Sequence, residues 1–107
     1  MYLRVEHRSI ELAASLRDLL KRLERCDRDL ASQLRRATGS IALNIAEGLG
    51  RVGKDRLHHY RVARGSALEV DAALRLAVAW GYLSQEGAEQ SLDLVEGIQK
   101  MLSGLLK

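Results

Sequence analysis

The sequence predicts an all-α protein, an antiparallel up-down-up-down four-helix bundle that forms one domain over residues 1–107. Apolar residues recur every three or four positions in four segments of the chain, which is typical of amphipathic helices. None of the 107 residues is proline, which would remove a backbone donor and clash one turn back inside a helix. The connections between the segments are short, and this favours antiparallel neighbours.

Composition excludes several classes of protein. Hydrophobic residues make up 47% of the chain and charged residues 29%, which is ordinary for a globular domain and argues against disorder. The single cysteine, Cys26, cannot form an internal disulfide, so a secreted disulfide scaffold is not indicated. No apolar run approaches about 20 residues, and Met1 does not open a signal-peptide pattern. We therefore expect a cytoplasmic protein without a membrane span.

The first predicted helix covers residues 9–25, with Ser9 as its N-cap. Its expected buried stripe is Ile10, Ala13, Leu16, Leu19, Leu20 and Leu23. Residues 1–8 alternate weakly between apolar and polar, so they are either a short arm or the first turns of this helix. We favour an arm that packs Tyr2, Leu3 or Val5 against the bundle or a neighbouring subunit.

The second predicted helix covers residues 30–47, with Asp27 or Asp29 as its N-cap. Its expected stripe is Leu30, Leu34, Ala37, Ile41 and Ile45. Gly39 inside it costs about 1 kcal/mol relative to alanine, which suggests that another backbone comes close there. Gly48, Gly50 and Gly53 are expected to end the helix, because glycine accepts the left-handed conformation.

The third and fourth predicted helices cover residues 55–80 and 84–105, with Gly81 closing one and Ser84 capping the next. Apolar residues between Ala67 and Trp80 cover more than one face, so we expect this helix to be buried on two sides, and self-association is one way to bury the second. Trp80 is either a cap over the core or a subunit contact. The expected stripe of the fourth helix is Ala88, Ser91, Leu92, Val95, Ile98, Met101, Leu102 and Leu105.

A line of polar residues runs along one face of the second helix at steps of four, four and three. If the second and third helices are antiparallel, residues at one level sum to about 105. This places Arg36 beside Glu69, Ser40 beside Ser66, Asn44 beside Arg61, and Glu47 beside His58. We call Arg36, Ser40, Asn44, Glu47, Ser66 and Glu69 the polar seam. We favour a register-setting role for it over a shared ligand site, with an Arg36–Glu69 ion pair, a Ser40–Ser66 contact, and Asn44 satisfied by backbone or Glu47.

Basic residues gather where the third helix begins. This basic cluster consists of Arg51, Lys54, Arg56, Arg61 and Arg64, interleaved with His58, His59 and Tyr60. Such residues contact phosphates and stack on bases, so they are candidates for binding nucleic acid. The alternative is a solvated helix start whose arginines pair with acids of the fourth helix, since residues 84–107 carry four acidic and two basic groups.

The residues that could support catalysis or bind metal form no recognisable site. His58 and His59 are adjacent and project about 100° apart, whereas metal-binding pairs on a helix are three or four residues apart. Cys26 has no nearby histidine in sequence, and Ser40 and Ser66 lie beside glycine, where small residues serve packing. We expect no enzymatic activity, metal or cofactor.

Two segments, RRATGSIALNIAEGLGR and YRVARGSALEV, resemble a small bacterial four-helix-bundle family. Its founding members are encoded in intervening sequences of large-subunit ribosomal RNA genes, and the accessory variability determinant of diversity-generating retroelements shares the fold. The resemblance implies a left-handed bundle that assembles into a ring-like homopentamer. It also implies a basic surface, which in the retroelement member binds nucleic acid and a reverse transcriptase.

These observations favour a non-enzymatic, oligomeric binding module that associates with RNA or a ribonucleoprotein through a basic surface. The alternative is a homo-oligomeric scaffold for protein–protein interaction with no nucleic-acid role. Self-association is the partner expectation common to both.

Overall fold

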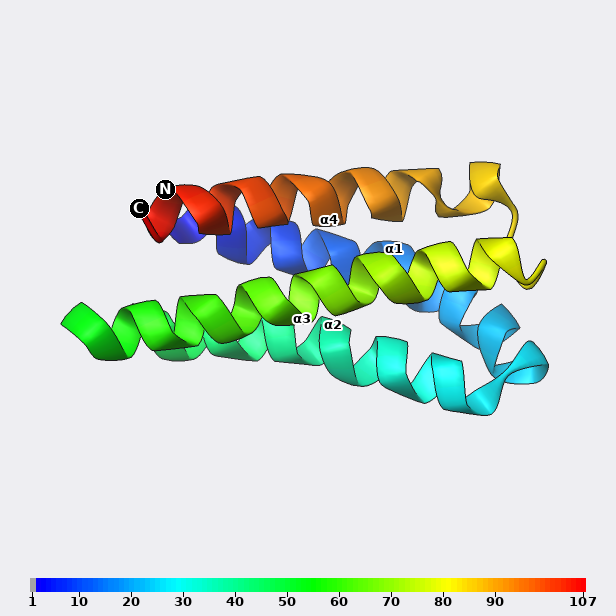
Figure 1. The fold of residues 1–107 in the computed structure, drawn as a ribbon, viewed down its shortest axis with the longest axis horizontal. Helices are drawn as coiled ribbons and strands as arrows, with labels where there is room; N and C mark the ends of the chain where they lie inside the picture. Colours follow the sequence, from blue (N-terminus) through cyan, green and yellow to red (C-terminus); the bar gives the residue numbers. More distant parts are fainter. Residues whose placement is uncertain (1) are drawn as a thin grey trace.

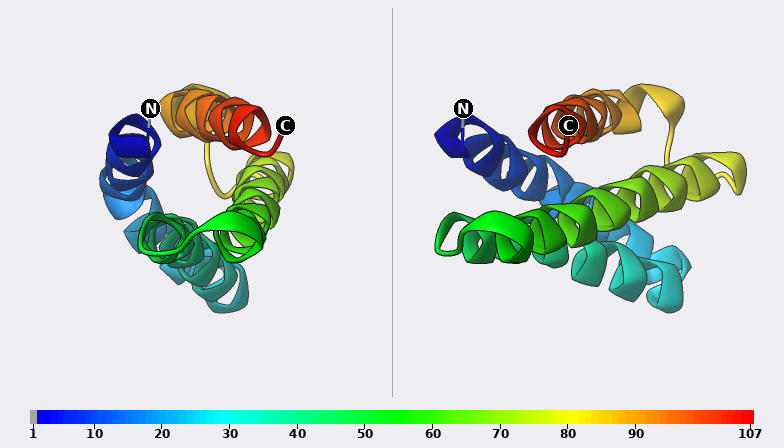
Figure 2. Two further views of the ribbon diagram at one scale, coloured as in Figure 1. Left: turned by 90° about the vertical axis from the view of Figure 1, so that its left-hand side faces the viewer. Right: turned by 60° about the vertical axis from the view of Figure 1, so that its left-hand side comes forward.

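The computed structural model describes residues 2–107, with side chains described from Arg4 onward, and confirms the predicted antiparallel four-helix bundle. Its helices are α1 (Tyr2–Cys26), α2 (Arg28–Leu49), α3 (Gly53–Ala79) and α4 (Gln85–Leu105). They run up, down, up and down along the long axis (Figure 1). Contacts join α1 to α2, α2 to α3, α3 to α4 and α4 to α1. Seen end-on, α1 and α3 therefore occupy opposite corners (Figure 2).

Helix α1 begins at Tyr2, so the predicted arm over residues 1–8 and the predicted start at Ser9 are both wrong. Ser9 is fully buried inside the helix, where its hydroxyl donates to the Glu6 carbonyl at 2.7 Å. This internal hydrogen bond lets a serine occupy a core position. Val5 packs in the core, as expected, whereas the Tyr2 and Leu3 side chains lie outside the described residues.

The buried stripe of α1 differs from the prediction only at its start, since Leu16 and Leu23 are buried and Leu19 and Leu20 pack against the core as expected. Ile10 is 59% exposed and Ala13 is exposed. The buried positions are Val5, Ser9, Leu12, Leu16 and Leu23. The prediction of Ser9 as the N-cap placed the first two stripe residues, Ile10 and Ala13, one position after the buried Ser9 and Leu12.

Helix α2 follows its prediction closely. The Asp27 carboxylate accepts a hydrogen bond from the Leu30 amide at 3.0 Å, which confirms Asp27 as the N-cap. The predicted stripe from Leu30 to Ile45 is buried throughout. Gly39 has no close neighbour, because a Cβ built there would meet nothing within 4 Å, so the predicted close approach at Gly39 is wrong. Gly48 lies inside the helix, and the left-handed turn residue is Gly53, with φ +59°.

Helix α3 buries one face in the protomer rather than the two that were expected. Its core positions are mostly small, which lets the neighbouring helices pack closely; they include Ala63, Ala67, Ala73 and Ala77. On the other side, Leu68 is 56% and Leu76 is 42% exposed. Trp80 is also 56% exposed and packs edge-on against Tyr82, with ring centroids 5.9 Å apart.

Helix α4 begins as predicted, because the Ser84 hydroxyl accepts a hydrogen bond from the Gly87 amide at 2.9 Å. Its predicted stripe lies in the core or packs against it. The Ser91 and Ser15 hydroxyls are 2.8 Å apart and link α4 to α1. None of the helices in the described chain has the length and hydropathy needed to cross a bilayer.

Candidate nucleic-acid interface

The centre of the polar seam is a hydrogen-bonded chain between α2 and α3. The Ser66 hydroxyl donates to the Ser40 hydroxyl at 2.8 Å, as the expected pairing of these residues requires. The Asn44 amide donates to the Ser40 carbonyl at 2.9 Å and to its hydroxyl at 3.1 Å. Asn44 is thus satisfied by backbone, as expected. Every member of this chain is half-buried, so the network fixes the register of the two helices at the edge of the core.

The outer part of the predicted seam does not form. Among residues 4–107, Arg36 and Glu69 make no ion pair, and both side chains are exposed. Helices α2 and α3 lie close together at their connecting turn and diverge away from it (Figure 1). Arg36 and Glu69 lie one helical turn further from the connecting turn than the bonded Ser40 and Ser66.

Asn44 pairs with His59 instead of lying against Arg61. The Asn44 side-chain oxygen is 3.0 Å from His59 Nδ1. The Asn44 amide nitrogen already donates to a carbonyl, so its oxygen faces the imidazole as an acceptor. His59 Nδ1 must therefore donate when the ring is neutral. The sequence-based alignment did not include His59 in the seam, because it paired Asn44 with Arg61, two residues after His59.

Arg56 has a structural role in the bundle and contributes less to a ligand-binding surface. Its guanidinium donates to the carbonyls of Gly48 and Leu49 at 3.0 and 3.3 Å. These carbonyls are in the last turn of α2, beyond the reach of amides within that helix, and the Gly48 carbonyl also accepts a hydrogen bond from the Arg51 backbone amide at 3.1 Å. A basic side chain is favourable at this position because the helix dipole places partial negative charge there. Arg56 therefore caps α2 from the first turn of α3.

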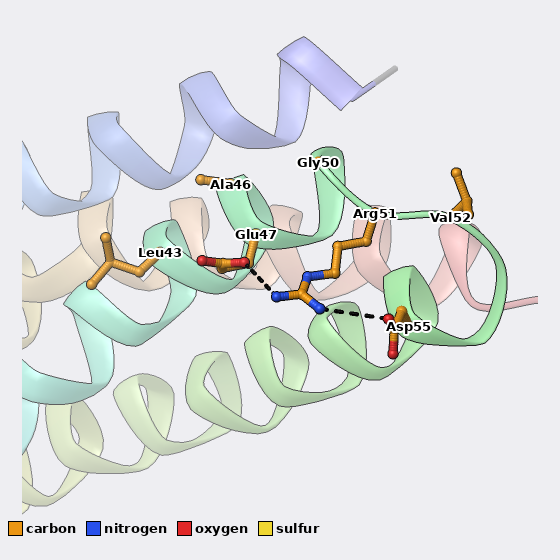
Figure 3. Close-up of a pocket in the computed structure, with 7 residues that line it drawn as sticks. All are labelled: Leu43, Ala46, Glu47, Gly50, Arg51, Val52 and Asp55. Carbon is orange, nitrogen blue, oxygen red and sulfur yellow. Dashed lines mark hydrogen bonds and ion pairs between the residues drawn. The ribbon is translucent and has the colours of Figure 1, made fainter.

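Arg51 is partly neutralised by two acids on either side of the turn. Its guanidinium lies 3.3 Å from Glu47 and 3.5 Å from Asp55 (Figure 3). Glu47 thus pairs with Arg51 rather than His58. A shallow groove beside this trio is lined by exposed apolar side chains, including Leu43 and Val52. The acids paired with Arg51 come from the α2–α3 hairpin, not from the fourth helix as the alternative required.

The remaining cations of the basic cluster face solvent. Lys54 and Arg61 are exposed, as is His58 between them, and steps of four and three residues place all three on one face of α3. Within the described chain none of these three side chains forms an ion pair. Arg64 is half-buried and lies about 60° around the helix from Arg61. The five predicted contact residues therefore divide into structural and solvent-facing sets.

Two described residues outside this surface, Tyr82 and Arg75, have shifted pKa values. Burial raises the pKa of the Tyr82 phenol, and the nearby Asp27 carboxylate and its hydrogen bond raise it further. The hydrogen bond that the Arg75 guanidinium donates to Asp71, together with the charge of that carboxylate, raises the pKa of Arg75. Both residues are in the half of the bundle that contains the α3–α4 connection. Among the described residues, no cluster of three or more histidine, cysteine or acidic side chains could hold a metal ion.

Comparison with known proteins gives a consistent result. The model of the family described as 23S rRNA-intervening sequence protein matches residues 1–104. A crystal structure from Bacteroides thetaiotaomicron, of a protein with unknown function from the S23 ribosomal protein family, superposes with a TM-score of 0.87. That protein is 25% identical, and the match covers 96% of this chain and 98% of the other. A search of curated proteins found no match.

Proposed function

The chain belongs to the 23S rRNA-intervening sequence protein family, and on this premise we propose that it is an oligomeric, non-enzymatic module that binds RNA. The proposed contact surface is the outer face of the first half of α3. Its central residues are Lys54, His58 and Arg61, with Arg51 and Arg64 at its margins.

The observation that carries this proposal is the absence, within the described residues, of acidic partners for the two central cations. Lys54 and Arg61 form no ion pair within the described residues, whereas Arg51 and Arg56 are engaged inside the hairpin. Exposed, unpaired cations can exchange their counterions for phosphates, and this exchange dominates nucleic-acid affinity. The imidazole of His58 lies between them and offers a flat surface for stacking on a base.

Self-association would strengthen a patch of this size. Net charge is only +3 for the whole chain, so one copy presents a weak field. Several copies that present the same α3 face would bring their patches within reach of one RNA strand. Affinity would then rise through effective concentration without any new contact. A ring of five copies, as the family resemblance implies, is one such arrangement.

The test is fluorescence anisotropy with a labelled generic RNA oligonucleotide at low and raised salt. We expect binding at low salt that weakens steeply as salt is added, because phosphate contacts release counterions. The double variant Lys54→Ala/Arg61→Ala should lose most of the affinity. A matched control is Arg4→Ala/Arg25→Ala, which removes two exposed cations from α1. Absence of binding at low salt would overturn the proposal.

A second candidate function is a protein–protein scaffold with no nucleic-acid role. It is favoured by the large apolar side chains that the protomer leaves in solvent, Leu43 at 69%, Val52 at 79% and Trp80 at 56% exposed among them. The RNA titration separates the two candidates, because a scaffold of this kind would oligomerise but show no salt-dependent binding.

A binding role is favoured over catalysis by how the polar groups are used. The Ser40 hydroxyl accepts from Ser66 and Asn44, while His59 contacts Asn44 rather than a hydroxyl. No nucleophile is therefore paired with a base in this network, as acyl or phosphoryl transfer through a serine would need. We expect this RNA-binding role to be carried out in the cytoplasm.

A further inference from the structure

The second half of α3 presents apolar side chains to solvent. Leu68 is 56% and Leu76 is 42% exposed, and Ala72 lies between them on the same face. These residues follow the basic half of α3 along the same outer surface. Arg64, which precedes Leu68 by one helical turn, is at the edge of this apolar face.

A groove between α1 and α4 carries complementary features. Its floor includes Leu94 and Met101, which pack against the core from outside. Gly97 leaves a gap between them, because a Cβ built there would meet nothing within 4 Å. The groove occupies about 670 Å³.

The rim of this groove is acidic. Glu89 and Asp93 are both exposed, and neither forms an ion pair among residues 4–107. They are four residues apart on α4, where like charges repel. Arg8 on the opposite rim is already neutralised by Glu11 at 2.8 Å. The groove thus combines an apolar floor with unpaired negative charge, which suits a partner that is apolar and flanked by a cation.

We propose that the α1–α4 groove receives the apolar face of α3 from a second copy of this chain, with Leu68 seated over Gly97. The order of residues supports this register: Arg64 lies four residues before Leu68, and Asp93 lies four residues before Gly97. Parallel packing of the two helices therefore brings Arg64 beside Asp93 when Leu68 fills the gap. This inference rests on the self-association included in the proposed function and identifies its surfaces.

The contact joins unlike surfaces. Helix α3 is at the corner of the bundle opposite α1, so its outer face points away from the α1–α4 groove (Figure 2). Two rigid copies cannot make the contact reciprocally, and each copy uses its α3 and its groove on different neighbours. Such head-to-tail contacts produce closed rings or chains rather than simple dimers. Of the basic cluster, Arg64 takes part in the contact, whereas Lys54 and Arg61 stay outside it.

The first experiment measures mass in solution by light scattering after size exclusion. Gly97→Leu fills the groove and suits a helix, and Leu68→Glu places charge on the docking face. Each variant alone should be monomeric, and mixing them should give a one-to-one dimer, because one intact groove and one intact α3 face remain. Leu43→Glu is the control, since Leu43 is 69% exposed on α2 outside the contact, and it should keep the wild-type mass.

The second experiment tests the register through charge. Arg64→Asp and Asp93→Arg should each weaken assembly at least tenfold, and the double variant should restore it. A wild-type protein that is monomeric at all concentrations would contradict the proposed self-association itself. A wild-type oligomer that neither Gly97→Leu nor Leu68→Glu dissociates would contradict only the docking surfaces, as would a mixture that stays monomeric.

Discussion

Gly48 of α2 lies directly against the ring of Tyr60 of α3. A Cβ built on Gly48 would be 2.5 Å from Tyr60 Cε1 and 2.9 Å from Cδ1, which is too close for any side chain. Tyr60 is 1% exposed and is the largest fully buried side chain among residues 4–107. The glycine therefore lets the last turn of α2 pack on this ring, next to the connecting turn that positions the basic cluster.

Gly48→Ala should destabilise the protein by about 1–3 kcal/mol, the usual cost of overpacking a core. Helix propensity works in the opposite direction, by about 1 kcal/mol in favour of alanine. The clash should dominate because a buried ring cannot move aside freely. Urea unfolding followed by circular dichroism measures the difference. Gly39→Ala is the matched control: it has open space around it and should stabilise α2, so equal effects at the two sites would contradict this account.

The neutral form of His59 should carry its proton on Nδ1. Asn44 fixes this tautomer, because its side-chain oxygen is the group that faces the ring at 3.0 Å. Long-range ¹⁵N–¹H NMR spectra distinguish the two tautomers directly. Asn44→Ala should remove the preference, while His7, exposed on α1, should be unaffected by that change. Protonation on Nε2 in the wild-type protein would show that the seam does not orient the imidazole.

The fold could be predicted from sequence more completely than the surface that the fold creates. The stripe of α2 was correct because large branched residues at three- and four-residue steps have one way to be buried. The start of α1 was missed because Ser9 is a residue type common both at N-caps and, when bonded to its own helix, inside a core. Local sequence does not distinguish these two uses.

Contacts in the candidate site could be predicted only where two residues at the same height on α2 and α3 touch for that reason alone. Ser40 and Ser66 meet because they lie where α2 and α3 are still close. Arg36 and Glu69 lie only one helical turn further along, yet these exposed side chains do not pair, because a shared level does not by itself bring two surface side chains together. The role of Arg56 was also missed, since reaching the carbonyls of Gly48 and Leu49 depends on the path of the turn in three dimensions.

The pKa of Tyr82 should respond to the charge of Asp27. Burial is the main cause of its raised pKa and the Asp27 carboxylate is the second, so Asp27→Asn should lower it without restoring the ordinary value. Asparagine caps helices as well as aspartate does, so α2 should be retained. NMR titration of the Tyr82 ring carbons measures the shift.

The same pKa shift predicts how stability changes in alkali. A phenol whose pKa is raised by folding stabilises the folded state below the unfolded pKa, about 10, and loses that contribution as pH rises through the folded value. Stability should therefore fall above about pH 10, and Tyr82→Phe should reduce the slope of that decline. An unchanged slope in this variant would assign the alkaline loss to other groups.

The variants Arg56→Ala and Arg61→Ala should distinguish cations that stabilise the fold from cations that bind RNA. Arg56→Ala removes the donor to two terminal carbonyls of α2 and should cost about 1 kcal/mol of unfolding free energy. Arg61→Ala should leave stability within about 0.5 kcal/mol, because the side chain is exposed and forms no ion pair among the described residues.

In RNA titrations Arg61→Ala should have the larger effect of the two variants. Arg61→Ala should lower affinity and reduce the slope of log K against log salt by about 0.7 to 0.9, the loss of one phosphate contact. Arg56→Ala, measured at a temperature where it stays folded, should keep the wild-type slope, because a guanidinium held by two carbonyls does not release a counterion on binding. If Arg56→Ala changed the slope and Arg61→Ala did not, the cap would be the ligand contact, and the division of the basic cluster would have to be reversed.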